Sequence, residues 1–212
     1  MKQETTQIIT DAFPFFESIR LQDGVFHLLP WHQARMERSI RAHYQTKSVP
    51  QLVEFLNNFK HPEKGCFKYR ISYGQSLEAP EVMPYRAKNI SSLRLVVAND
   101  LEYSYKSNNR QQLEALFNQR NDCDDVLIIK NGLITDTSYC NIVFFDAKRW
   151  LTPTHPLLEG VQRSFLLQQG IIHEAEVRAE DLFRFQSFKL INAMLPWETA
   201  VEIPINSNVI QI

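Results

Sequence analysis

The chain has 212 residues, a hydrophobic content of 44% and a formal net charge of −1. Its length allows one large domain or two small ones with a sizeable core, and the near-neutral charge gives no general electrostatic reason to bind nucleic acid or an acidic membrane. We therefore expect a small-molecule ligand, with no nucleic acid and no membrane as partner.

The cysteines and the N-terminal residues favour a cytoplasmic protein. Cys66, Cys123 and Cys140 are an odd number without a C-x-x-C pair, so neither a disulfide framework nor a cysteine zinc site is favoured. Residues 1–13 are polar and acidic, unlike a signal peptide, and no run approaches about 18 apolar residues.

The first part of the chain is predicted to form three strands and two helices. Gln22-Asp23-Gly24 is a hairpin turn signal between the first two strands. Pro30 suits the first turn of a helix, and the alternation from Phe67 to Tyr73 is typical of a strand with one buried face. The predicted strands span residues 12–20, 25–28 and 67–73, and the predicted helices span residues 30–44 and 50–60.

Residues 78–90 contain Pro80 and Pro84 and are predicted to be irregular. The predicted elements before this stretch are two strands, two helices and a third strand. The stretch separates them from the remainder of the chain. We place a domain boundary there, which gives domains of residues 1–86 and 87–212.

The second part is predicted to be richer in strands. Asn131-Gly132 is the strongest hairpin signal in the chain, because both residues tolerate the positive φ of a type I′ turn. Gly160 precedes a predicted helix, and Gly170 is placed to cap its C-terminus. The predicted strands span residues 93–98, 126–129, 133–134, 142–145, 188–191, 200–203 and 209–212, and the predicted helices span residues 110–120, 161–169 and 179–185.

Short polar side chains come after the second strand of the Asn131-Gly132 hairpin. Taken alone, Asp136 could be a turn residue, and Thr135 could bond the local backbone. Thr-Asp-Thr-Ser-x-x-Asn141 nevertheless crowds polar groups between flanks that look buried. Buried polar groups need partners, and a bound polar ligand is one way to provide them.

Other candidate groups have equally simple readings. Lys106 resembles any surface lysine, and Arg35 could lie on a solvated helix face. Gly160-Val161-Gln162 at a helix start offers backbone N–H groups, which together with an arginine could hold a phosphate. The histidines lack metal-ligand spacing, and there is no Walker loop, G-x-G-x-x-G or G-x-S-x-G, so metal, nucleotide and serine-hydrolase sites are not favoured.

Five short motifs occur in order between about Phe15 and Ile205. They are Phe16-Glu-Ser-Ile-Arg20 with Asp23-Gly24; His32-x-x-Arg35-Met36; Lys106-Ser-Asn-Asn109-Arg110; Asn131-Gly-Leu-Ile-Thr-Asp136-Thr-Ser-x-x-Asn141; and Thr152-Pro153 with Leu158-Glu-Gly-Val-Gln-Arg163. At this spacing they resemble the class IV aminotransferases, the fold-type IV group of pyridoxal-phosphate (PLP) enzymes. That family includes branched-chain aminotransferases, D-amino-acid aminotransferases and 4-amino-4-deoxychorismate lyases.

The resemblance implies an α+β fold of two domains, similar to D-amino-acid aminotransferase. Residues 1–86 would form the small N-terminal α/β domain, and residues 87–212 the larger, mostly β domain that carries the Schiff-base lysine. PLP would lie at the interface between the two. A homodimer in the cytoplasm is the expected assembly.

The resemblance also implies a role for each candidate residue. Lys106 would bind PLP covalently and then act as general acid and base. Asp136 would lie beside the pyridine nitrogen and keep it protonated, so that the ring accepts electrons. Asn141 and Thr135 would shape the site. The phosphate would be held by Arg35, by the amides of Val161 and Gln162, and by Asn192 with Ala193.

Three residues differ from the family pattern. The family usually has Glu where Asp136 stands, and Asp reaches one methylene less. Gln162 replaces a threonine, which leaves the backbone amide as the phosphate contact. Glu159 replaces a proline and adds negative charge near the anion site, which is unfavourable unless the side chain points to solvent. The first motif also lies near the start of the chain, so we expect the family's preceding edge strand to be absent.

Within the family, Lys106 followed by Asn109-Arg110 is more similar to the lyases. The function that we expect is elimination of pyruvate from 4-amino-4-deoxychorismate to give 4-aminobenzoate, a step of folate biosynthesis. One alternative is a class IV aminotransferase acting on branched-chain or D-amino acids with a 2-oxo acid. Another is a non-catalytic PLP-binding or interaction protein.

Overall fold

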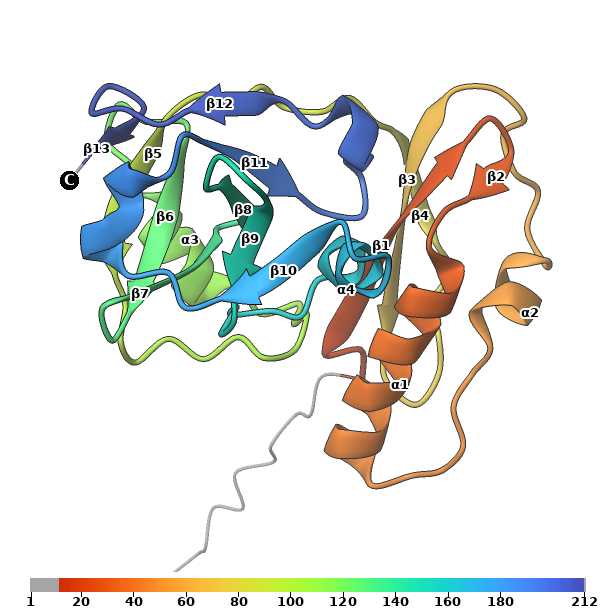
Figure 1. The fold of residues 1–212 in the computed structure, drawn as a ribbon. Helices are drawn as coiled ribbons and strands as arrows, with labels where there is room; N and C mark the ends of the chain where they lie inside the picture. Colours follow the sequence, from red (N-terminus) through yellow and green to blue (C-terminus); the bar gives the residue numbers. More distant parts are fainter. Residues whose placement is uncertain (1–11, 212) are drawn as a thin grey trace, which may run out of the picture.

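Two β-sheets organise the molecule, a computed structural model that describes residues 12–211 (Figure 1). A four-stranded sheet belongs to the first part of the chain, and a nine-stranded sheet belongs to the second. The secondary structure is mixed, with more strand than helix, as the predicted α+β class requires. Residues 1–11, for which the sequence predicts no signal peptide, and residue 212 lie outside the described part.

The four-stranded sheet has the order β2-β1-β3-β4 and is antiparallel throughout. Asp23 and Gly24 have φ values of 48° and 80°, so the predicted hairpin turn is confirmed. Two helices pack on this sheet and add Met36, Ile40, Leu52 and Leu56 to its core. The elements are β1 (Phe15–Gln22), β2 (Val25–Phe26), α1 (Leu29–Tyr44), α2 (Leu52–Leu56), β3 (Cys66–Tyr73) and β4 (Glu81–Pro84).

Two predictions for this part were wrong in extent. The helix predicted over 50–60 is only the five residues of α2. The stretch 78–90 was predicted to be irregular but contains β4. Because β4 lies at one edge of the sheet, it tolerates Pro84, whose ring removes one backbone donor.

The nine-stranded sheet has the path β10-β9-β8-β7-β6-β5-β13, and β11 joins it through β8 and β12. Asn131 and Gly132 have φ values of 52° and 80°, which confirms the hairpin between β6 and β7. The strands are β5 (Leu93–Val97), β6 (Asp125–Lys130), β7 (Leu133–Thr137), β8 (Asn141–Phe145), β9 (Trp150–Pro153), β10 (Ile172–Ala175), β11 (Ser187–Ile191), β12 (Glu202–Pro204) and β13 (Ile210–Gln211).

The helices of the second part are short. They are α3 (Gln111–Phe117), α4 (Val161–Gln168), and the 3-10 helices η1 (Ala179–Arg184) and η2 (Trp197–Thr199). The segment 179–185 was predicted to be an α-helix and is instead the tighter η1. Gly170 has a φ of 68°, so it can end α4 in the left-handed conformation that the sequence predicts. Strands β9 and β10 were not predicted.

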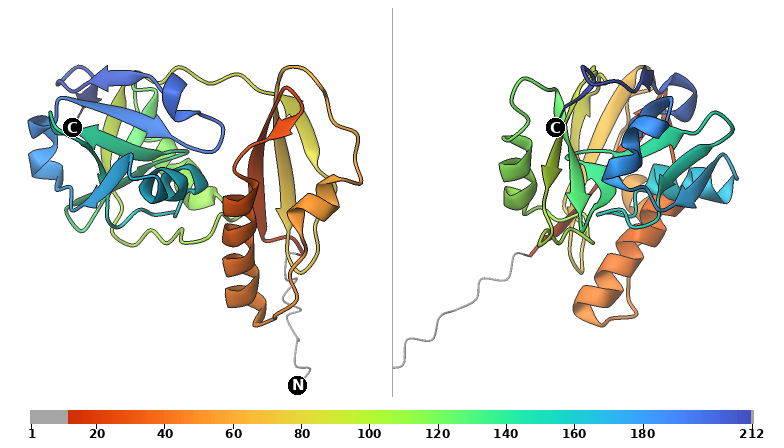
Figure 2. Two further views of the ribbon diagram at one scale, coloured as in Figure 1. Left: turned by 45° about the vertical axis from the view of Figure 1, so that its right-hand side comes forward. Right: turned by 60° about the vertical axis from the view of Figure 1, so that its left-hand side comes forward.

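The start of β1 joins the two sheets. Phe16 N donates to Lys106 O at 3.0 Å, and Asn108 N donates to Pro14 O at 2.8 Å. On the other side, α1 packs against α4, where the Trp31 and Phe165 rings meet edge to face with centroids 5.1 Å apart. Figure 2 (left) shows α4 on the side of the large sheet that is turned toward α1 and β1. The division into domains 1–86 and 87–212 stays a prediction.

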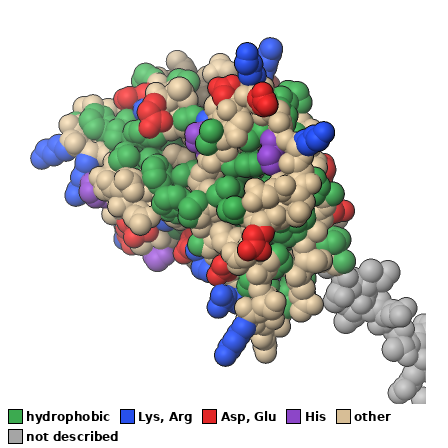
Figure 3. Space-filling model, turned by 90° about the vertical axis from the view of Figure 1, so that its right-hand side faces the viewer, with side chains coloured by type: hydrophobic (Ala, Val, Ile, Leu, Met, Phe, Trp, Pro, Cys, Tyr) green, Lys and Arg blue, Asp and Glu red, His purple; other side chains and the backbone are tan. Residues whose placement is uncertain are grey.

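The surface mixes apolar and charged side chains. Figure 3 views the side of the four-stranded sheet, where hydrophobic side chains gather in the middle with charged ones around them. In the described residues, no helix has the length and apolar character needed to cross a membrane.

Phe144 tests the core of the large sheet. The Phe144 side chain is fully buried, whereas Phe183 in η1 is 49% exposed. Phe144→Ala should lower the free energy of unfolding by about 3–5 kcal/mol, because it removes buried area and leaves a cavity. The matched Phe183→Ala should cost less than about 1 kcal/mol. Urea denaturation measures both, and equal losses would contradict this assignment of the core.

Candidate active site

A cavity of about 650 Å³ lies between the two sheets, and it gathers most of the predicted site residues. β1, β3, the segment after β5, the β7–β8 turn and the start of α4 all contribute to its wall. Gln162 is buried in α4 and is not part of the wall that residues 12–211 form. The predicted residues in the wall are Arg35, Lys106, Asp136, Asn141, Val161, Asn192 and Ala193. Their predicted roles are not tested by this proximity.

Lys106 is partly exposed to the cavity and is held by its backbone to β1. Its Nζ lies 4.6 Å from the centroid of the Phe16 ring. Withdrawal from bulk water lowers the pKa of Lys106 to about 7, and the positive charge of Arg35 acts in the same direction. A large share of Lys106 is therefore an uncharged amine near neutral pH, the form that acts as nucleophile or base.

Asp136 is fixed by two donors on different elements. Its Oδ1 accepts from Asn141 Nδ2 at 2.8 Å, and its Oδ2 accepts from the backbone N–H of Leu158 at 2.9 Å. Burial raises the pKa of Asp136 to about 6, although these hydrogen bonds act in the opposite direction. A cationic partner in the cavity would keep this carboxyl ionised over a wider pH range.

Glu17 lies beneath the cavity and was not predicted as a functional residue. Its carboxylate is fully buried and accepts from Arg35 Nε at 2.9 Å, from Arg35 Nη2 at 2.5 Å and from His32 Nδ1 at 2.6 Å. Burial alone would raise the pKa of Glu17, but Arg35 and His32 outweigh it and hold the value at about 2. Glu17 therefore orients Arg35 at the cavity wall.

Gly160, the residue before α4, is closely packed against Asn141. A Cβ on Gly160 would lie 1.9 Å from Asn141 Oδ1, so only glycine fits there. In the described chain, no side chain caps the N-terminus of α4. The first backbone N–H groups of α4 are consequently suited to an anion in the cavity.

Glu159 does not oppose that anion. Its side chain is 65% exposed and pairs with Arg38 of α1 at 2.9 Å. The Glu159 side chain thus points to solvent, the orientation in which its charge is tolerated near the anion site.

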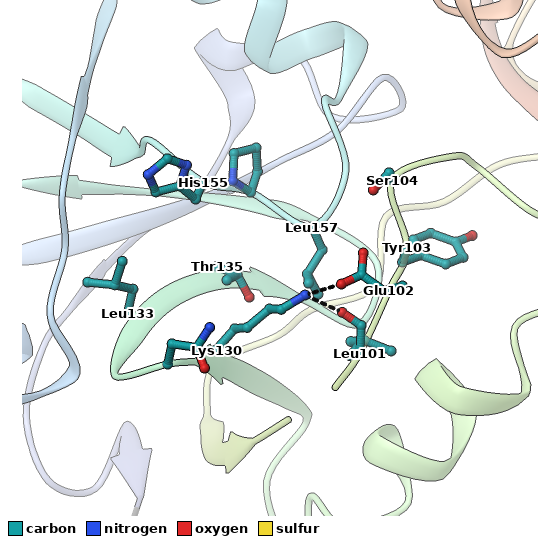
Figure 4. Close-up of a pocket in the computed structure, with 11 residues that line it drawn as sticks. Leu101, Glu102, Tyr103, Ser104, Lys130, Leu133, Thr135, His155 and Leu157 are labelled. Carbon is teal, nitrogen blue, oxygen red and sulfur yellow. Dashed lines mark hydrogen bonds and ion pairs between the residues drawn. The ribbon is translucent and has the colours of Figure 1, made fainter. Parts of the chain in front are cut away.

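A second cavity, of about 250 Å³, shares Tyr103 and Leu157 with the first (Figure 4). Lys130 reaches into it, but its Nζ already donates to Leu101 O at 2.8 Å and to Glu102 Oε1 at 2.6 Å. Of the candidate residues, only Thr135 lines it, and Thr135 Oγ1 donates to Ile128 O. Within residues 12–211 no cluster of His, Cys, Asp and Glu could hold a metal ion.

The family model for amino-transferase class IV matches residues 14–203. The chain belongs to this family. An uncharacterized protein of Haemophilus influenzae is 36% identical over 185 residues, covering 86% of this chain and 98% of that protein. The predicted family is thus confirmed.

Solved structures agree with this assignment. A candidate 4-amino-4-deoxychorismate lyase of Haemophilus somnus superposes with a TM-score of 0.81 at 33% identity, covering 87% of this chain and 98% of that one. A hypothetical aminotransferase of Mycobacterium tuberculosis, in its PLP-bound form, superposes with a TM-score of 0.72 at 19% identity, covering 94% of this chain and 82% of that one. The predicted fold class is confirmed.

Glu17→Gln tests the buried pair beneath the cavity. Leaving Arg35 unpaired should lower the free energy of unfolding at neutral pH by about 3–5 kcal/mol. Because the folded pKa of Glu17 is below its ordinary value of 4.5, its contribution is full above that value and is lost as pH falls toward about 2. Urea denaturation as a function of pH measures both effects.

Glu37→Gln is the matched control. Glu37 also pairs with an arginine, Arg41, but near the surface, with a distance of 3.1 Å. This variant should lose less than about 1 kcal/mol and keep the acid dependence of the parent protein. If the two variants behave alike, Glu17 has no special role in the fold.

Lys106 should react with amine reagents at lower pH than a lysine of ordinary pKa. With fluorodinitrobenzene and peptide mapping, its labelling rate should reach half its maximum near pH 7, because the pKa of Lys106 is about 7. A midpoint for Lys106 near the ordinary lysine value of 10.5 would contradict the lowered pKa.

Proposed function

We propose that this class IV enzyme eliminates pyruvate from 4-amino-4-deoxychorismate and releases 4-aminobenzoate. The observation that carries the proposal is the cavity in which an amine of lowered pKa, Lys106, lies with the buried carboxylate Asp136 and the arginine Arg35. As a member of the family, the chain is a PLP-dependent enzyme.

The residues of the cavity fit PLP. A phosphate would be held by Arg35, since Glu17 takes its Nε and one Nη2 hydrogen while a guanidinium has five N–H donors. The uncapped start of α4, with Gly160 close to Asn141, gives that phosphate a second support. Asp136 would face the pyridine nitrogen, and Lys106 would bind the cofactor aldehyde.

When bound, PLP supplies an electron sink that stabilises the charge left on a substrate carbon after a proton departs. The uncharged Nζ of Lys106 takes the proton from the ring carbon that bears the amino group. The C–O bond to the enolpyruvyl group then breaks, the ring becomes aromatic, and the departing enol gains a proton to become pyruvate. Atoms balance without an oxidant or a second substrate.

Asp136 contributes electrostatically in this scheme. Its two hydrogen bonds, from Asn141 and Leu158, fix the carboxylate so that it need not reorganise during the reaction. A cation facing Asp136 would favour its ionised form, which in turn would hold the pyridine nitrogen protonated.

The lyase is preferred over an aminotransferase for two reasons. Lys106 is followed by Asn109-Arg110, the sequence similar to the lyases. The Haemophilus somnus structure, at 33% identity, is also described as that of a candidate lyase. An aminotransferase would use the same residues and is the second candidate, and a PLP-binding protein without activity is the third.

The predicted homodimer, the cytoplasmic location and the place in folate biosynthesis belong to this proposal. Sedimentation equilibrium of the purified protein tests the dimer directly.

Product analysis tests the reaction. The PLP-loaded protein should form 4-aminobenzoate and pyruvate in equal amounts without a 2-oxo acid. Asp136→Asn should lower turnover by roughly 10² or more, because a fixed charge beside the reacting system is lost. Lys106→Ala should abolish turnover and the covalent attachment of PLP that borohydride traps.

Lys130→Ala is the control, since this lysine lines only the second cavity and should leave turnover unchanged. A strict requirement for a 2-oxo acid would replace the lyase by the aminotransferase. PLP attachment without either product would leave a binding protein.

A further inference from the structure

We propose that Asn108 is a positioning residue for Lys106. Its side-chain amide fastens the Lys106 segment, residues 104–110, to the start of β1 and to β3, and this holds the amine beside the charged side chains of β1 and α1. The inference rests on the proposed function, because it concerns the amine of the same site. It adds a residue that, within the described chain, is not part of the cavity wall.

The surroundings of the Lys106 amine come from both sides of the cavity. Lys106 itself lies between β5 and α3, outside any helix or strand. Because no regular element holds it, its distance from the four-stranded sheet depends on what fastens its segment there. The titratable groups that act electrostatically on the amine are Glu17, His32 and Arg35 on the side of the four-stranded sheet, and Arg110 and Cys140 on the side of the nine-stranded sheet.

Backbone pairing between this segment and β1 is very short. Phe15 and Ser107 form an isolated antiparallel bridge, flanked by the two hydrogen bonds that Phe16 N and Asn108 N donate. Even a complete two-stranded hairpin is only marginally stable in water, so a bridge of this length opens readily unless side chains support it.

The Asn108 side chain supplies that support with both ends of its amide. Its Nδ2 donates to Phe13 O at 2.6 Å and to Phe15 O at 3.3 Å. Its Oδ1 accepts from Arg70 Nη2 at 2.5 Å. The carbonyls of Phe13 and Phe15 flank that of Pro14, which accepts from the Asn108 backbone N–H at 2.8 Å. One residue therefore binds three consecutive carbonyls at the start of β1, together with a side chain of β3.

The bond to Arg70 also concerns the aromatic ring that the amine contacts. Arg70 Cζ lies 4.3 Å from the centroid of the Phe16 ring, and Lys106 Nζ lies 4.6 Å from the same centroid. Asn108 thus fixes the stretch of chain that bears Phe16 and one of the groups that pack on its ring. An amide suits this position because it is uncharged and adds no charge of its own near the amine.

Release of this contact should change the acid–base behaviour of Lys106 in one direction. Exclusion of water lowers the pKa of Lys106 most, and the charge of Arg35 lowers it further, whereas Glu17 acts in the opposite direction. A segment that separates from β1 admits water to the amine and moves it away from Arg35 and Glu17 alike. Because the two lowering effects outweigh that of Glu17, the pKa of Lys106 should rise toward its ordinary value.

Asn108→Ala tests this inference in the protein without PLP. The midpoint for labelling of Lys106 by fluorodinitrobenzene should rise by about 1 pH unit from its value near 7, a tenfold change in the ratio of charged to uncharged amine. A general loss of stability would not move this midpoint, because the midpoint is a property of the folded protein.

Asn58→Ala is the matched control. Asn58 Nδ2 also donates to two backbone carbonyls, those of Glu54 at 3.1 Å and Phe55 at 3.2 Å, but both belong to its own turn at the end of α2. This variant removes the same chemical group and should keep the midpoint of the parent protein.

Turnover as a function of pH should show the same effect. In PLP-loaded Asn108→Ala, kcat at pH 7 should fall about 5-fold, the loss of uncharged amine that a rise of about 1 pH unit produces, and the deficit should almost vanish at about pH 9. KM should change little, since Asn108 does not line the cavity that the described residues form.

Hydrogen exchange of the parent protein provides a test that needs no folded variant. The Phe16 and Asn108 amides should exchange at least about 100-fold more slowly than unprotected amides, because the contact between the segment and β1 stays closed. Free exchange of both amides would overturn the inference. An unchanged Lys106 midpoint in folded Asn108→Ala, or an equal rise in Asn58→Ala, would overturn it as well.

Labelling and exchange are measured without cofactor or substrate, so their results are independent of the reaction. Any of these contrary results, together with normal formation of 4-aminobenzoate by the parent protein, refutes only the inference. Failure of the parent protein to bind PLP or to form product, together with a raised midpoint in Asn108→Ala, refutes the proposed function and leaves the role of Asn108 in place.

Discussion

The backbone hydrogen bonds between the start of β1 and the Lys106 segment set the geometry of the cavity. Phe16 N binds Lys106 O, and Asn108 N binds Pro14 O, so two sheets from different parts of the chain share one short stretch of pairing. These bonds therefore fix the position of the β1 side chains that point into the cavity relative to the amine of Lys106. Backbone pairing suits this task because it does not depend on a long, flexible side chain.

Glu17, the next residue along β1, explains how positive charge can be concentrated there. A buried arginine without a partner would be costly, but Glu17 accepts two hydrogen bonds from Arg35 and a third from His32. Its negative charge also favours the charged form of Lys106, which partly offsets the effect of Arg35. The pKa of Lys106 therefore reflects a balance that extends beneath the cavity.

Much of the fold could be predicted from local patterns, because turns and alternation are local properties. Asp23-Gly24 and Asn131-Gly132 adopt the positive φ angles that their residue types predict. β10 pairs in parallel with β9 across the α4 connection, so no hairpin turn marks it. β9 follows β8 through the turn at Asp146–Arg149, which lacks an Asn-Gly or Asp-Gly signal.

The site was only partly predictable for a similar reason. The polar residues after the Asn131-Gly132 hairpin indicated a buried polar cluster, and Asp136 and Asn141 are indeed paired across β7 and β8. Glu17 and Arg70 lie on strands in which polar and apolar residues alternate. That alternation predicts a solvent-facing polar side as readily as a polar side facing a cavity. Their partners, Arg35 and Asn108, are 18 and 38 residues away, and no spacing rule connects them.

Asp136 shows how the chain accommodates a shorter carboxylate than the family usually has. Its Oδ2 reaches the amide of Leu158, and Asn141 Nδ2 donates both to Asp136 and to Leu158 O at 2.9 Å. Asn141 Oδ1 in turn lies where a Cβ of Gly160 would be. The segment before α4 is thus drawn against Asp136, and the carboxylate and the helix N-terminus form one rigid unit. A longer or shorter side chain at position 136 would therefore shift both the carboxylate and the N-terminus of α4, the two parts of the proposed cofactor site.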